Sequence, residues 1–139
     1  MRTFAMSVCA VIAVSLPARA DCPWSPEDFN DDAKVAAHVA CRQAEMFDAF
    51  NRADAAYRDM TVRLTELYLL LTAEGDKRLD QRQSAWLAGT EKACPPATKE
   101  VDEMTAHANC LEGAYVDRAK FLDQRLAECK SVGCQLDRL

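Results

Sequence analysis

Cysteine is the residue type in this chain with the clearest potential for chemistry. Seven cysteines occur, and six of them follow residue 20: Cys22, Cys41, Cys94, Cys110, Cys129 and Cys134. Cysteines can form disulfides, bind a metal or supply a reactive thiolate, and the compartment of the protein largely decides between these outcomes. In an oxidising compartment, an even set of six predicts three disulfides with no thiol left over.

The first 20 residues have the features of an export signal. Arg2 supplies a positive start, residues 4–16 are mostly apolar, and Ala18-Arg19-Ala20 is a small-x-small cleavage site. We therefore expect residues 1–20 to be a signal peptide, removed together with Cys9, and residues 21–139 to be a periplasmic or secreted protein. Arg19 and Asp21 do not fit the pattern of a lipid anchor on Cys22, so no membrane anchor is expected after cleavage.

Outside the cysteines, no residue pattern points to catalysis or to a cofactor. His38 and His107 are isolated, and no C-x-x-C pair accompanies them to suggest a zinc site. The sequence has no G-x-S-x-G nucleophile motif, glycine-rich phosphate loop, haem-attachment motif or calcium loop. We therefore predict a protein that is not an enzyme, needs no cofactor or metal and acts by binding.

Length and charge limit the size of the fold and the kind of partner. Removing 20 of the 139 residues leaves 119, which predicts a single small domain over residues 21–139. The mature chain has 15 basic and 22 acidic residues, a formal charge of −7 that argues against nucleic acid as a partner. An acidic surface favours a basic partner, although it also serves solubility alone. No second apolar stretch reaches the ~20 residues that span a bilayer.

The elements that position the cysteines are predicted to be helices. Apolar residues at alternating spacings of four and three form one stripe: Met46, Phe50, Ala53, Tyr57, Met60, Leu64, Leu67 and Leu71. This stripe predicts a helix over residues 42–74, roughly 50 Å long at ~1.5 Å per residue. Gly75 follows the last apolar turn and is expected to end this helix.

Further helices are predicted on both sides of this one. Residues 77–93 form a second helix ended by Cys94-Pro95-Pro96, and residues 101–129 keep the apolar spacing except at Arg118. Ser25-Pro26-Glu27-Asp28 has the residues of a helix start, so a short leading helix is expected from there toward Ala40. The predicted fold class is all-α, a small antiparallel helical bundle stapled by disulfides.

Six cysteines allow 15 pairings, and the sequence does not choose between them. Separation along the chain favours Cys94 with Cys110, which flank the connection between the second and third long helices. Cys129 and Cys134 would then close the short loop 130–133, and Cys22 would join Cys41. A bridge between Cys41 and Cys110 would contradict this ranking.

The assembled pattern resembles the N-terminal domain of the LprI-type lysozyme inhibitors, a family of small exported bacterial proteins. The match covers residues 41–122 and keeps the family spacings L-x3-Q-x2-W-x7-C and C-L-x6-R-x3-L. The residues that carry it are Cys41, Tyr57, Leu79, Gln83, Trp86, Cys94, Cys110, Leu111, Arg118 and Leu122. The resemblance implies an exported helical protein that binds and inhibits a lysozyme.

The chain departs from the family pattern in two blocks. Phe50, Ala53 and Asp54 stand where the family has Asp, Leu and Asn, and Thr90-Glu91 replaces an Arg-Asp pair. The family motif residues Gln83, Trp86 and Arg118 could form a site. We favour a structural role, in which Trp86 packs into the bundle and Gln83 contacts Arg118 between helices, because buried polar groups need partners.

Two acids and a cystine loop complete the set of candidate residues. An inward Arg118 is expected to have an acid nearby, either Glu91 or Asp54. The loop closed by Cys129 and Cys134 offers Lys130 and Ser131 as a candidate binding loop, similar to the loop that the unrelated Ivy class of inhibitors inserts into lysozyme. These residues could meet the carboxylate pair of the enzyme. A simple C-terminal staple is the interpretation we favour for this loop.

The acids Glu27, Asp28, Asp31 and Asp32 form a cluster. It is typical of a solvated helix start, and the alternative is steering toward a basic partner. The sequence as a whole predicts an exported protein that binds lysozyme or another basic protein. The alternative is a periplasmic immunity protein or a cell-envelope adaptor without lysozyme activity.

Overall fold

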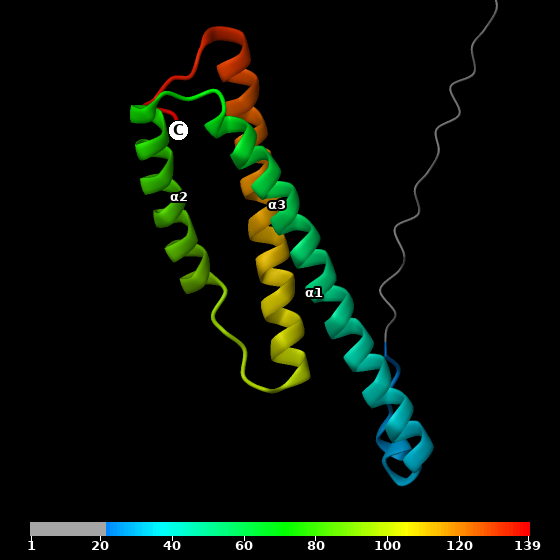
Figure 1. The fold of residues 1–139 in the computed structure, drawn as a ribbon. Coiled ribbons are helices and arrows are strands. Elements are labelled where there is room, and N and C mark those ends of the chain that lie inside the picture. Colours follow the sequence, from blue (N-terminus) through cyan, green and yellow to red (C-terminus); the bar gives the residue numbers. More distant parts are fainter. Residues whose placement is uncertain (1–21) are drawn as a thin grey trace, which may run out of the picture.

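A computed structural model describes residues 22–139, so the predicted signal peptide at residues 1–20 lies outside the described residues. The described chain contains one 3-10 turn and three long helices, and no strand. The elements are η1 (Pro26–Asn30), α1 (Asp32–Tyr68), α2 (Ala73–Ala93) and α3 (Val101–Val132). Figure 1 shows the three helices side by side, with α2 running opposite to α1 and α3. The predicted all-α bundle stapled by disulfides is confirmed.

Helices α1 and α3 run parallel in a constant register. Arg42 forms an ion pair with Asp102, and Arg63 Nε lies 2.7 Å from Asp123 Oδ1, so that each pair joins positions 60 residues apart. Arg52 repeats this offset, with Nε 3.0 Å from Glu112 Oε2. The small buried side chains of Ala49, Ala53 and Ala108 accompany this contact, which allows the two helices to approach closely.

The apolar core lies in the half of the bundle where α1 ends and α2 begins. Its buried members come from all three helices and from the last residue of the chain: Met60, Leu67, Leu79, Ala119, Leu122, Leu126 and Leu139. Leu136 packs against the same cluster, and Arg82 Nη2 on α2 donates to the carbonyl oxygen of Asp137 at 2.9 Å. The C-terminal tail therefore folds back over the start of α2.

The connection between α1 and α2 differs from the prediction. The helix expected over residues 42–74 ends at Tyr68, and α2 begins at Ala73, so Leu71 lies in the connection rather than on α1. Thr72 caps α2, with its side-chain oxygen accepting from the Gly75 amide at 3.5 Å. Gly75 is thus in the first turn of α2 and does not end α1. The acids Glu74 and Asp76 favour a helix start there.

Of the other helix boundaries, the end of α2 agrees with the prediction and the start of α1 does not. The predicted end of α2 before Cys94-Pro95-Pro96 is confirmed, since α2 ends at Ala93. The leading helix is shorter than expected, because η1 ends at Asn30 and α1 already starts at Asp32 rather than at residue 42. Asp31 causes this early start, as its carboxylate accepts from the amides of Ala33 and Lys34 and caps α1.

Three disulfides fasten these elements. They join Cys22 to Cys41, Cys94 to Cys110 and Cys129 to Cys134, the pairs that separation along the chain favours. The first ties the N-terminal segment to α1, and the second ties the end of α2 to α3. The third closes the end of α3 onto the following turn, where Cys134 Sγ lies 3.7 Å from the Leu70 carbonyl oxygen.

Candidate functional site

Four family-motif residues are brought together between α1, α2 and α3. Arg118 donates from Nε and Nη2 to Gln83 Oε1, at 3.0 and 2.8 Å, and both side chains are buried. The Arg118 guanidinium carbon also lies 5.3 Å from the ring centre of Trp86. Tyr57 joins this cluster through Tyr115, whose ring stands edge-on to it at 5.3 Å and lies 6.2 Å from Trp86.

The predicted acid beside Arg118 is wrong. Asp54 forms an ion pair with Arg58, and Glu91 is exposed on α2. Within residues 22–139 no carboxylate forms an ion pair with Arg118. Instead, the faces of Trp86 and Phe121 cover its charge, with the Phe121 ring centre 4.7 Å away. Burial lowers the pKa of Arg118 below its ordinary value, and the nearby Tyr68 acts in the opposite direction.

This cluster has the features of a link between helices. Large side chains hold α2 against α1 and α3, and the hydrogen bonds from Arg118 to Gln83 join polar groups buried among them. Tyr68 adds a second link, because its hydroxyl donates to Asp80 Oδ1 on α2. Burial, followed by that hydrogen bond, raises the pKa of Tyr68 to about 12.

The C-terminal cystine lies at the end of α3 in the manner of the staple that we favoured, rather than closing a projecting loop, the alternative considered from the sequence. Lys130, Ser131 and Val132 belong to the last turn of α3, and Gly133, with a φ of 86°, ends the helix. Lys130 Nζ lies 3.7 Å from Glu66 Oε2 on α1, and Ser131 Oγ donates to the Glu128 carbonyl oxygen at 3.1 Å. The geometry is that of a helix end held against α1.

The acidic cluster lies at the opposite end of the molecule, around η1. Asp28 there accepts from Lys34 Nζ at 2.7 Å and from both the amide and the hydroxyl of Ser25. The hydrogen bonds from Lys34 and Ser25 hold the pKa of Asp28 below its usual value. Ser25 and Asp28 form the capping box of η1, and the bond from Lys34 joins this turn to the first turn of α1.

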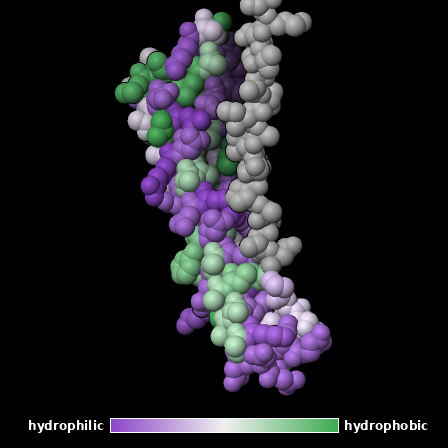
Figure 2. Space-filling view, turned by 90° about the vertical axis from the view of Figure 1, so that its right-hand side faces the viewer, coloured by the Kyte–Doolittle hydropathy of each residue, from purple (hydrophilic) through white to green (hydrophobic). Residues whose placement is uncertain are grey.

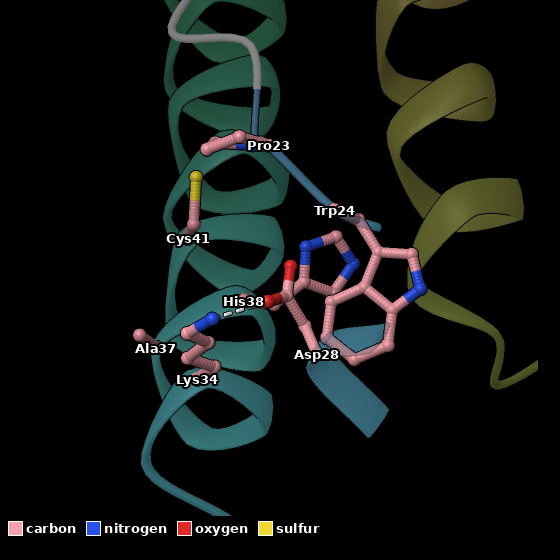
Figure 3. Close-up of a pocket in the computed structure, with 7 residues that line it drawn as sticks. All are labelled: Pro23, Trp24, Asp28, Lys34, Ala37, His38 and Cys41. Atoms are coloured by element: carbon pink, nitrogen blue, oxygen red, sulfur yellow. Dashed lines mark hydrogen bonds and ion pairs between the residues drawn. The ribbon is translucent and has the colours of Figure 1, made fainter. Parts of the chain in front are cut away.

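A shallow pocket of about 340 Å³ lies between η1 and α1. Figure 3 shows the Trp24 ring facing His38, with Asp28 and Lys34 joined on one side and Cys41 above. The Trp24 and His38 ring centres are 4.6 Å apart, and His38 Nδ1 is buried without a hydrogen-bond partner. Sequence reasoning did not single out Trp24 or Phe29. Two aromatic residues on either side of a helix-start motif were the available signal.

The described residues hold no group of three histidine, cysteine or carboxylate side chains that could bind a metal ion. His107 Nδ1 is buried without a hydrogen-bond partner, and His107 is not among the residues that line the pocket with His38. Within residues 22–139, none of the helices combines the length and the apolar character that a membrane crossing requires.

Comparison with known families identifies a match over most of the described helices. The family described as lysozyme inhibitor LprI matches residues 31–122, which is 92 of the 139 residues. The matched segment contains α1, α2, the Gln83–Arg118 pair and the Cys94–Cys110 disulfide. Searches of curated proteins and of solved structures find no match. The match covers well over half of the chain and includes the motif residues that contact one another between the helices. The chain therefore belongs to the LprI lysozyme inhibitor family.

Proposed function

We propose that this protein is an exported inhibitor that binds a lysozyme and blocks cleavage of cell-wall glycan. The observation that carries the proposal is the family match over residues 31–122. The motif residues Gln83, Trp86 and Arg118 support it, because they form a contact between α2 and α3 that matches the motif of this family. The protein would act by steric blockage and would itself perform no chemistry.

The disulfides support a location outside the cytoplasm. Three cystines in 118 described residues suit an oxidising compartment, since cytosolic thiols are kept reduced. The signal peptide predicted at residues 1–20 points the same way, and a periplasmic or secreted protein is the resulting proposal. The mature chain would then be residues 21–139, folded as one domain, with lysozyme or another basic protein as its partner.

The test is an inhibition assay with the oxidised mature protein. Clearing of a cell-wall suspension by chicken-type, goose-type and invertebrate-type lysozymes would be followed at increasing inhibitor concentration. We expect saturable inhibition of at least one enzyme. The control is the same protein reduced and capped with iodoacetamide, which keeps the net charge but removes the disulfides. Loss of inhibition in that sample would separate specific binding from a charge effect.

A folded protein that leaves all three enzymes active would overturn the proposal. The chain would then have the family's fold with another binding role, as an immunity protein against an imported toxin or as an envelope adaptor. Copurification of a toxin encoded beside this protein would support the first of these roles.

A further inference from the structure

The N-terminal end of the protein projects beyond the helical bundle. Arg42 on α1 forms an ion pair with Asp102, in the first turn of α3, so α3 has no residues beside α1 before that point. Among the described residues, the first ten residues of α1 therefore extend past α3 and are accompanied by η1 and the segment before it, as Figure 1 shows at its lower end. We call residues 22–41 the N-terminal clasp.

The clasp is held in one conformation. The Cys22–Cys41 disulfide closes it, and the hydrogen bonds of Asp28 with Ser25 and Lys34 fix η1 against α1. A surface that is already ordered loses little conformational entropy when a partner binds. Its projection also makes it accessible to a large protein without hindrance from α2 or α3.

Aromatic side chains are exposed on this clasp. Phe29 is 73% exposed and Trp24 is 38% exposed, and their ring centres are 5.4 Å apart. The Trp24 ring also forms one wall of the pocket with His38 (Figure 3). Adjacent exposed aromatic residues on a rigid element are typical of binding hot spots, where they become buried in the partner.

The charge of the clasp selects the class of partner. It contains four acidic residues and one lysine. Its formal charge of −3 is a large part of the −7 of the mature chain, although the segment is short. Lys34 is paired with Asp28. Within the described chain, Glu27 and Asp32 form no ion pair, so their charges face solvent. Figure 2 shows hydrophilic surface over the lower end of the molecule, beside a strip of weakly hydrophobic residues.

We propose that the N-terminal clasp is the surface by which this protein docks on a basic protein. Phe29 and Trp24 are its apolar anchors, and Glu27 and Asp32 attract the partner. The inference rests on the proposed function in naming lysozyme as that partner. A second copy of this chain fits poorly, because two clasps would bring like charges together. These carboxylates would not attract an acidic or neutral cell-wall glycan.

The anchor is tested with Phe29→Ser in the mature, oxidised protein. The matched control is Leu69→Ser, because Leu69 is 81% exposed at the opposite end of α1. Binding would be measured by surface plasmon resonance on the lysozyme that the wild-type protein inhibits. We expect Phe29→Ser to weaken binding by about tenfold or more, as loss of a hot spot does, and Leu69→Ser to leave it unchanged. Unchanged thermal melting of both variants would show that the fold is retained.

The charge is tested with Glu27→Lys against Glu91→Lys, which makes the same charge change on exposed α2. We expect the association rate to fall more for Glu27→Lys than for Glu91→Lys at low salt. The difference should shrink at high salt, where the field is screened over a few ångströms.

The outcomes separate the two proposals. If the wild-type protein inhibits lysozyme and Phe29→Ser and Glu27→Lys inhibit equally well, the clasp is not the docking surface, and the proposed function remains. If the wild-type protein binds no lysozyme but binds purified peptidoglycan, both proposals are overturned. Equal losses in the clasp variants and their controls would also overturn the clasp as the specific surface.

Discussion

The Arg118 guanidinium donates two hydrogen bonds to a single oxygen of the buried Gln83 amide, at 3.0 and 2.8 Å. This pair joins α3 to α2 where large aromatic side chains separate the two helices. The positive charge of Arg118 is removed from water, and the Gln83 amide oxygen and the faces of Trp86 and Phe121 together compensate for this. The register of α2 depends on this contact.

Replacing Gln83 with leucine should destabilise the protein substantially. The substitution keeps the approximate volume but leaves the Arg118 charge buried without its acceptor, which typically costs about 3 kcal/mol. Urea denaturation followed by circular dichroism would measure the loss. We expect the midpoint to fall without a change in the native spectrum.

The companion variants are Arg118→Met and the double variant Gln83→Leu/Arg118→Met. The double variant should be more stable than Gln83→Leu alone, because no buried charge remains to be compensated. If Arg118→Ala kept its full stability and lost only lysozyme binding, Arg118 would be a contact residue and the structural role would be wrong.

Gly75 is predicted to resist substitution although it lies in a helix. A Cβ atom at this position would lie 3.0 Å from Leu71 Cδ2 and 3.1 Å from Leu136 Cδ2. Gly75→Ala should therefore lower the free energy of unfolding by ~1–2 kcal/mol through overpacking, despite the better helix propensity of alanine. The same urea titration would measure this.

Gly89→Ala is the matched control in the same helix. Nothing lies within 4 Å of a Cβ atom there. Alanine should then raise the free energy of unfolding by roughly 0.5–1 kcal/mol, because it restricts the unfolded chain and favours the helix. Destabilisation by both substitutions to the same extent would refute the packing argument at Gly75.

The phenol of Tyr68 should ionise late. Burial and the hydrogen bond to Asp80 raise its pKa to about 12, from an ordinary value of 10.0. Between these values the unfolded chain releases the proton first, so stability should fall as pH rises from about 10 to 12. Ultraviolet absorbance would show a phenol titrating near the upper value in the native protein, and Tyr68→Phe would remove it.

Tyr68→Phe should also weaken the decline in stability across the same pH range, relative to the wild-type protein. Tyr115→Phe is the control, since burial raises the pKa of Tyr115 without a hydrogen bond to a carboxylate. An identical pH dependence of stability in wild type and Tyr68→Phe would mean that burial and the Asp80 contact do not raise the pKa of Tyr68 in the native protein.

The two disulfides outside the clasp, Cys94–Cys110 and Cys129–Cys134, should differ in their effect on the free energy of unfolding. Cys94 and Cys110 are 16 residues apart, whereas Cys129 and Cys134 are five apart. Closing the longer loop removes more entropy from the unfolded chain, ~3 kcal/mol against ~2 kcal/mol in the chain-entropy model. Removing each pair by Cys→Ala substitution and comparing urea midpoints would check the order. A larger loss for the Cys129–Cys134 pair would contradict it.

The sequence predicted the parts of the fold that local chemistry decides. The double proline at Pro95-Pro96 marks the end of α2, and the apolar spacing places Met60 and Leu67 in the core. The contact between Gln83 and Arg118 was also predicted, because a polar side chain that points into the bundle needs a hydrogen-bond partner. These inferences depend on single residues or on helical periodicity, which the sequence displays directly.

The parts that were missed depend on tertiary contacts. The apolar stripe continues through Leu71, so periodicity alone does not show that α1 ends at Tyr68 and that Thr72 caps α2. The acid expected beside Arg118 was absent because aromatic faces and an amide replace it, which requires the packing of three helices. The clasp was overlooked because Trp24 and Phe29 gain meaning only when η1 folds back on α1.

The register of α1 against α3 has a consequence for how such a protein can diversify. Because α3 starts beside Arg42, substitutions in the ten preceding residues of α1 alter the outer surface without touching the core that begins around Met46. Substitutions of exposed residues at this end, other than Cys41 and Lys34, which fasten the clasp, are therefore largely free of a folding penalty. The clasp can change in sequence with a changing target while the frame stays constant, in the way that variable loops evolve on a constant scaffold.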